Sequence, residues 1–122
     1  MMIRVLTMLG LLLAVSPAYA EDCFHMSQMQ QWKAPDKKTI YIRVNLNQYY
    51  RLDLAGSCPL VTGPDVRLNT KSHGGDLVCS ALDWDLSVSE NGVGGIAEPC
   101  IVSTMTKLTP EQVAALPPKA KP

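Results

Sequence analysis

The side chains that could carry out acid–base or metal chemistry are few, and one group stands out by type and spacing. His73 lies in a glycine-containing loop with Asp76 three residues on, and Asp83 and Asp85 follow on one face of an expected strand. An imidazole beside carboxylates can act as a general base or bind a metal ion. These four residues define one hypothesis, a small hydrolase or metal-binding enzyme. No Gly-x-Ser-x-Gly segment supplies a serine nucleophile, so we favour a solvated loop histidine and a solvated strand face.

The second histidine, His25, lies two residues after Cys23, and a Cys-x-His segment can bind a metal. A partly exposed histidine beside a disulfide accounts for the same residues without any ligand. We therefore predict no metal site, no cofactor and no catalytic residue.

The four cysteines are Cys23, Cys58, Cys79 and Cys100. They contain no Cys-x-x-Cys pair, and their wide spacing fits no zinc ribbon or knuckle. An even number of cysteines in an exported chain favours two structural disulfides. Three pairings are possible. A bridge that closes the turn-rich segment between Cys58 and Cys79 gives a slight preference for Cys58–Cys79 together with Cys23–Cys100.

Residues 1–20 have the pattern of a secretory signal peptide. Arg4 precedes an apolar run, and Ala18-Tyr19-Ala20 is a small-x-small cleavage sequence. We therefore expect cleavage after Ala20 and a periplasmic or secreted protein. The remaining chain keeps ten of the 11 lysines and arginines against 11 aspartates and glutamates. No basic patch predicts a nucleic-acid partner, and no second apolar stretch predicts a membrane span.

The chain after residue 20 is predicted to form one β-rich domain over residues 21–116, followed by a disordered tail over residues 117–122. We expect β-strands over residues 39–46, 49–54, 66–69, 77–89 and 96–108, the last as one strand or a pair. Apolar and polar residues alternate over the first two and over residues 82–89, which is the period of a strand and places Leu82 on an apolar face. A bend is expected near residues 79–81. Thr109 and Gln112 form a capping box with Pro110 between them, which predicts a helix. Residues 24–32 could form a short helix or an irregular lead-in. The fold expected is mainly β: a small antiparallel curved sheet or barrel with short terminal helices, held by two disulfides.

Two of the expected strands place aromatic and cationic side chains on one outward face. Tyr41, Arg43, Tyr49 and Arg51 share this parity if residues 39–46 and 49–54 form a hairpin. Tyrosine and arginine together are typical of binding interfaces. Cross-strand pairing that only stabilises the sheet is the competing interpretation, and a short helix or the tail could cover this face. The four residues are our candidate binding surface.

The order of several residues resembles a family of small exported Gram-negative proteins whose domain has no known function. The resemblance rests on segments spread over residues 23–108: Cys23-Phe24, Tyr49-Tyr50, Cys58-Pro59-Leu60, Val78-Cys79 with Asp83, Cys100-Ile101 and Lys107-Leu108. It implies an exported location and a β-rich fold. It implies no activity and no catalytic residue.

Taken together, these observations predict a non-enzymatic, disulfide-bonded protein of the cell envelope. Its expected role is an interaction or ligand-binding module whose partner is a protein or small ligand of the envelope. The alternative is the small hydrolase or metal-binding enzyme built on His73, Asp76, Asp83 and Asp85. A purely structural envelope protein with no defined ligand is a third hypothesis.

Overall fold

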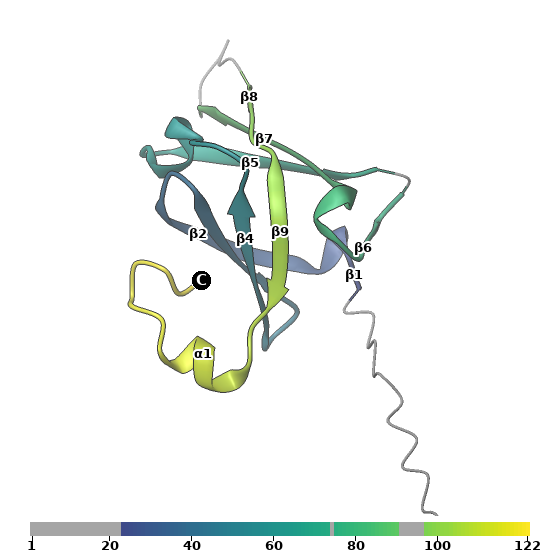
Figure 1. Ribbon diagram of the computed structural model, residues 1–122, viewed down its shortest axis with the longest axis vertical. Helices are drawn as coiled ribbons and strands as arrows, with labels where there is room; N and C mark the ends of the chain where they lie inside the picture. Colours follow the sequence, from purple (N-terminus) through teal and green to yellow (C-terminus); the bar gives the residue numbers. More distant parts are fainter. Residues whose placement is uncertain (1–22, 74, 91–96) are drawn as a thin grey trace, which may run out of the picture.

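The computed structural model describes residues 23–73, 75–90 and 97–122. The expected signal peptide, residues 1–20, lies outside them. The described chain is mainly β, with three antiparallel sheets and the helix α1 (Pro110–Ala114) (Figure 1). No helix in this part of the chain has the length and apolar character needed to cross a membrane.

The largest sheet has four strands in the order β2-β3-β4-β9. Its central hairpin follows from alternation, because Ile40, Ile42 and Val44 are fully buried on one face while intervening side chains point to the other. Asn45 has a φ of 54° and ends the strand, so the expected extension to Leu46 is wrong and that side chain is exposed. The strands are β2 (Met29–Asp36), β3 (Thr39–Val44), β4 (Gln48–Leu54) and β9 (Val102–Lys107).

A second sheet has the order β5-β7-β8, and a two-stranded ladder pairs β1 with β6. Their bounds are β5 (Val66–Ser72), β7 (Trp84–Glu90), β8 (Glu98–Pro99), β1 (Phe24–His25) and β6 (Leu77–Val78). The two larger sheets meet between β8 and β9. There the Cys100 N–H donates to the Leu86 carbonyl at 2.9 Å, and the Ala55 N–H donates to the Ile101 carbonyl at 2.8 Å. The chain thus bends from one sheet into the other, as the expected curved sheet requires.

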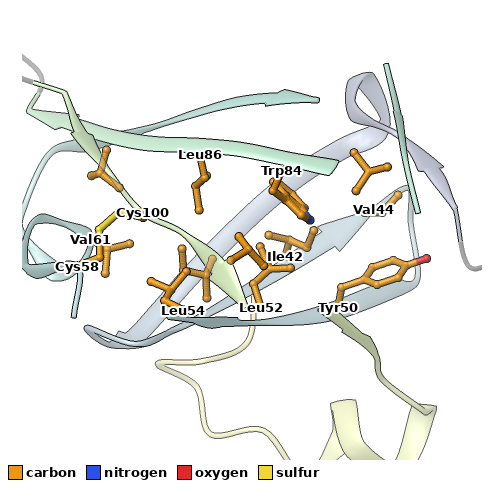
Figure 2. Close-up of a cluster of buried hydrophobic side chains, with 14 of the residues drawn as sticks. Ile42, Val44, Tyr50, Leu52, Leu54, Cys58, Val61, Trp84, Leu86 and Cys100 are labelled. Atoms are coloured by element: carbon orange, nitrogen blue, oxygen red, sulfur yellow. A yellow bond between two sulfur atoms is a disulfide. The ribbon is translucent and has the colours of Figure 1, made fainter. Parts of the chain in front are cut away.

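The hydrophobic core fills the space between these sheets (Figure 2). The Phe24 ring lies 4.9 Å from that of Tyr50 and 6.1 Å from that of Trp84, measured between centroids. The Trp84 indole N–H donates to the Met105 sulfur at 3.3 Å, so this buried donor has a partner. Fully burying each such aliphatic or aromatic side chain stabilises the fold by roughly 1.5–3 kcal/mol. With one phenylalanine in the whole chain, the core depends mainly on aliphatic residues.

The four cysteines form two disulfides, as predicted, but the preferred pairing is wrong. The bridges are Cys23–Cys79 and Cys58–Cys100. Cys23 and Cys79 each flank one strand of the β1–β6 ladder, which brings them together. Cys58 and Cys100 are both buried and join the segment after β4 to the bend between the two sheets. Each bridge therefore fastens a junction between sheet elements rather than closing the turn-rich segment.

Two further expectations are corrected. Residues 24–32 form β1, the 3-10 helix η1 (Met26–Gln28) and the start of β2, not one short helix. Residues 77–89 were expected to form one strand bent near residues 79–81; the chain does turn there, but the 3-10 helix η3 (Ala81–Asp83) divides the stretch into β6 and β7. The Asp83 carboxylate accepts the backbone N–H groups of Cys79 and Ser80 at 2.7 and 3.0 Å, which turns the chain there. Leu82, expected on the apolar face, is consequently 86% exposed.

The C-terminal helix begins where the sequence predicts it. The Thr109 hydroxyl accepts the Gln112 N–H at 3.2 Å, and the Gln112 side chain accepts the Thr109 N–H at 2.9 Å. After α1 the chain turns back toward the four-stranded sheet (Figure 1). Residues 117–122 were expected to be a disordered tail, yet the Ala120 N–H donates to the Pro117 carbonyl at 2.9 Å and Ala120 is only 2% exposed.

Candidate functional site

The four residues expected to form a binding surface are neighbours on β3 and β4. In the antiparallel register Tyr41 lies opposite Arg51, and Arg43 lies opposite Tyr49. All four alternate with the buried core positions, so they occupy the outer face of the four-stranded sheet. Their placement on one face agrees with the sequence pattern.

Their surroundings differ. Tyr41 is only 8% exposed, Arg43 and Tyr49 are half-buried, and Arg51 is exposed. The Arg51 Nε donates to Asp53 Oδ1 at 3.0 Å, and this hydrogen bond raises the pKa of the Arg51 guanidinium. Asp53 also accepts the Thr104 hydroxyl at 2.9 Å. Arg51 thus belongs to a surface network of mixed charge, separate from the Arg43–Tyr49 pair.

The C-terminal segment covers part of this face. Lys121 and Pro122 line a shallow hollow together with Gln31 and Lys33 on β2. Lys121 also lines a cleft on the other side, together with Tyr49 on β4. Since β3 lies between β2 and β4, the segment crosses the outer face of β3. This coverage is consistent with the burial of the outward-facing Tyr41.

The cleft that Tyr49 lines, called the α1 cleft below, has a volume of about 630 Å³. Its walls come from the β3–β4 turn, the end of β9, helix α1 and the C-terminal segment. The walls carry apolar side chains, two amides and two lysines, and within the described part of the chain they include no aspartate or glutamate. The lining residues are Asn47, Gln48, Tyr49, Lys107, Leu108, Pro110, Val113, Ala114 and Lys121.

Backbone contacts place α1 against the end of the sheet. The Leu108 N–H donates to the Tyr49 carbonyl at 2.9 Å, which continues the β4–β9 ladder one residue past the strand. The Thr109 cap then begins the helix at once. Val113 on α1 is half-buried and forms one wall of the cleft rather than joining the core.

The residues of the enzymatic alternative do not gather at one place. His73 and Asp85 line a smaller hollow of about 300 Å³, beside Trp84. Asp83 is engaged in the backbone hydrogen bonds of η3, and Asp76 lies in another cluster. Among the described residues no three histidine, cysteine, aspartate or glutamate side chains are grouped to hold a metal ion.

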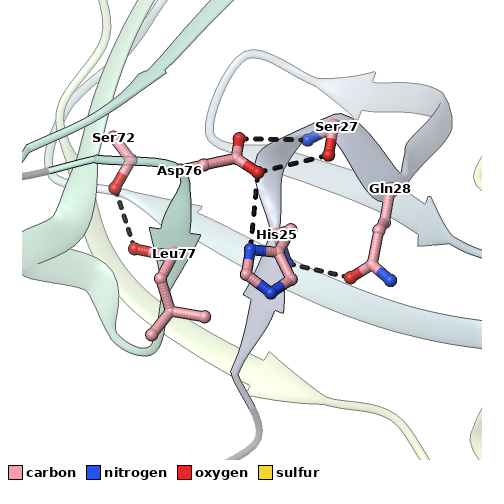
Figure 3. Close-up of polar contacts among 6 residues, drawn as sticks. All are labelled: His25, Ser27, Gln28, Ser72, Asp76 and Leu77. Carbon is pink, nitrogen blue, oxygen red and sulfur yellow. Dashed lines mark hydrogen bonds and ion pairs between the residues drawn. The ribbon is translucent and has the colours of Figure 1, made fainter.

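Asp76 instead fastens β1 and η1 to the β5–β6 connection (Figure 3). Its carboxylate accepts the Ser27 hydroxyl at 3.2 Å and the Ser27 N–H at 3.3 Å, and lies 3.4 Å from the His25 Nδ1. A Ser–His–Asp triad needs the serine hydroxyl on the imidazole. Here the hydroxyl bonds the carboxylate, so the cluster is arranged as a structural tie.

The α1 cleft as a whole was missed from the sequence, although one of its residues, Tyr49, was singled out. The capping box at Thr109 predicted the helix but not the face it would cover. The available signal was the position of the Thr109 cap directly after the last expected strand. A helix that begins there starts at the end of the sheet, so the chain around it lies near that end.

Comparisons with curated proteins and with solved structures found no match. Residues 2–121 match a family of unknown function (DUF6491). That match spans nearly the whole sequence, and it agrees with the resemblance drawn from the spaced cysteines and the strand residues. The chain therefore belongs to the family of unknown function DUF6491.

Proposed function

We propose that this protein is an exported, non-enzymatic binding module that holds a small ligand with an apolar portion in the α1 cleft. The observation that carries the proposal is the cleft itself. Its volume of about 630 Å³ lies within the range of roughly 300–1,000 Å³ that is typical of small-molecule sites. The β3–β4 turn, the end of β9, helix α1 and the C-terminal segment build it, so a ligand there would contact all four together.

The chemistry of the lining favours binding over catalysis. Leu108, Pro110 and Val113 offer apolar surface, and Asn47 and Gln48 offer amides that can orient a polar group. The lining residues that the structure describes include no histidine, cysteine, serine, threonine, aspartate or glutamate. This part of the walls thus offers none of the side chains used most often for nucleophilic and acid–base catalysis.

Export is part of the proposal. Residues 1–20 carry the charge, apolar run and cleavage sequence of a signal peptide. All four cysteines are paired in disulfides, which persist in oxidising compartments. A periplasmic or secreted protein, processed after Ala20, accounts for both observations.

A fluorescence titration tests the binding site. The uncharged dye N-phenyl-1-naphthylamine brightens in apolar surroundings and is small enough for the cleft. We expect saturable binding to the processed protein. Tyr49→Ala should weaken binding about tenfold, because an aromatic wall is lost; such a change corresponds to about 1.4 kcal/mol.

The matched control is Leu82→Ala, which alters the smaller hollow beside His73 and Asp85. It should leave dye binding unchanged. Absence of saturable binding, or loss of binding in Leu82→Ala but not in Tyr49→Ala, would overturn the proposal. Circular dichroism spectra of both variants confirm that each retains its fold.

A further inference from the structure

We infer that the ligand of the α1 cleft is an amphiphilic anion, with its acidic group held by Arg43 and Lys121 and its apolar part against α1. This inference rests on the proposed function, because it assigns a chemical class to the ligand of the same cleft. The acidic group can be a carboxylate, a phosphate or a sulfonate, since all three present oxyanions to cations in the same way.

The first support is the charge of the walls. Among the described residues that line the cleft, Lys107 and Lys121 are cationic and none is an aspartate or glutamate. Lys107 already has an interaction of its own, so the inference rests on Lys121. The whole chain is balanced, with 11 basic and 11 acidic residues, so a cleft of one sign is a local feature. Apolar walls beside such charges strengthen their attraction for an anion, because they lower the local dielectric.

The second and independent support is Arg43. Its Nε is buried and has no hydrogen-bond partner among the residues that the structure describes. Burying a charged donor without an acceptor costs free energy, so native structures rarely leave one in that state. A guanidinium is suited to an oxyanion, which can accept two parallel N–H groups at once. The atom therefore lacks the kind of partner that an anionic ligand would bring.

Arg43 is not itself one of the lining residues, but the strand register places it beside the cleft. Arg43 lies directly across from Tyr49, a cleft residue, on one side and from Gln31 on the other. Lys121 lines both the cleft beside Tyr49 and the hollow beside Gln31. Arg43 thus lies on the strand that the C-terminal segment crosses, next to the cationic end of the cleft.

Among the described residues, the acidic side chains near this face are already engaged or lie at its other end. Asp53 hydrogen-bonds Arg51 and Thr104 and stands four residues from Tyr49 along β4, roughly 13 Å at the strand rise. Asp36 accepts the Lys38 N–H at the far turn. Glu111 on α1 is exposed and is not among the cleft-lining residues. An anion from solution can supply the acceptor oxygens that the Arg43 Nε lacks and a negative charge opposite Lys121.

A pair of matched dyes tests this. Anilinonaphthalene sulfonate has the skeleton of N-phenyl-1-naphthylamine with one sulfonate added. At low salt we expect the sulfonate dye to bind at least about tenfold more tightly, as one charge-assisted hydrogen bond gives. Arg43→Gln and Lys121→Gln should each reduce the ratio of the two affinities, and the double variant should bring that ratio to about one; the ratio is the readout because a general change in the cleft affects both dyes alike. Rising salt should weaken only the sulfonate dye.

The matched controls are Arg67→Gln on β5 and Lys119→Gln, two exposed cations that line none of the hollows described above. Both should keep the preference for the sulfonate dye. Equal affinities for the two dyes would overturn the anion assignment but still support a ligand site in the cleft. If neither dye binds saturably, the proposed function is overturned. A preference insensitive to Arg43 and Lys121 would also overturn the assignment. Dodecanoate and dodecyl phosphate as competitors then distinguish a fatty-acid head from a phosphate head.

Discussion

Removing each disulfide separately should reveal that the two bridges stabilise the protein unequally. The perturbation is a pair of double variants, Cys58→Ala/Cys100→Ala and Cys23→Ala/Cys79→Ala. The bridged residues are 42 and 56 positions apart, respectively. Loop-closure entropy alone gives about 4 kcal/mol for each bridge, with the longer loop slightly ahead.

Burial reverses that order. Cys58 is 2% exposed and Cys100 is 5% exposed, whereas Cys79 is exposed and Cys23 is half-buried. Truncating two sulfur atoms inside the core adds about 1 kcal/mol for each, through lost burial and the cavity left behind. We therefore expect a loss of about 6 kcal/mol for the Cys58–Cys100 bridge against about 4 kcal/mol for the Cys23–Cys79 bridge.

Urea unfolding monitored by tryptophan fluorescence measures both losses. Total stabilities of small domains are about 5–15 kcal/mol, so a variant without the buried bridge can lie near the unfolding threshold. A second assay on the unmodified protein covers that case. Partial reduction with dithiothreitol, followed by alkylation and mass spectrometry, should open Cys23–Cys79 first because Cys79 is accessible. Equal or reversed losses, or earlier opening of Cys58–Cys100, would refute the reasoning.

Three further outcomes follow from individual contacts. Thr109→Ala should cost about 1 kcal/mol at the N-terminus of α1, seen as faster amide exchange in the helix and weaker dye binding; unchanged exchange would contradict the cap. Asp83→Ala removes two backbone hydrogen bonds and should cost about 1–2 kcal/mol by thermal unfolding, whereas a change within the measurement error would deny that η3 depends on it. Ile42→Ala, at a fully buried site, should cost about 2–5 kcal/mol, and Leu82→Ser should stay within about 0.5 kcal/mol; similar costs for both would contradict the burial pattern.

The β3–β4 hairpin was predictable because its alternation leaves one choice of buried face. Ile40, Ile42 and Val44 alternate with polar or aromatic residues, and a slip by one residue would expose all three. The cap at Thr109 was predictable for a local reason as well, since both partners of the capping box lie within one helical turn. The hairpin and the helix cap were thus predictable because the residues that determine them are close together in the sequence.

The features that failed depend on distant partners. Residues 24–32 carry a weak pattern because β2 is an edge strand whose Trp32 and Met29 are only half-buried. The cysteine pairing depends on where the bend between the two sheets brings Cys100, which no spacing encodes. Leu82 was misplaced because the carboxylate of Asp83 turns the backbone just before β7.

The candidate site was also predictable only in part. Strand parity put Tyr41, Arg43, Tyr49 and Arg51 on one face. It could not show that the chain after α1 returns over that face, because residues 119–122 have the composition of a solvated terminus. The α1 cleft lies where that segment, helix α1 and the β3–β4 turn meet, so strand parity alone did not show it.

An NMR titration of the processed, isotope-labelled protein with N-phenyl-1-naphthylamine tests the central claim most directly. If the α1 cleft binds the dye, we expect saturable chemical-shift changes of backbone amides confined to residues 47–49, 107–108, 111–114 and 121. Changes centred instead on Leu82 and Ile101 at the smaller hollow, or no changes at all, would contradict it.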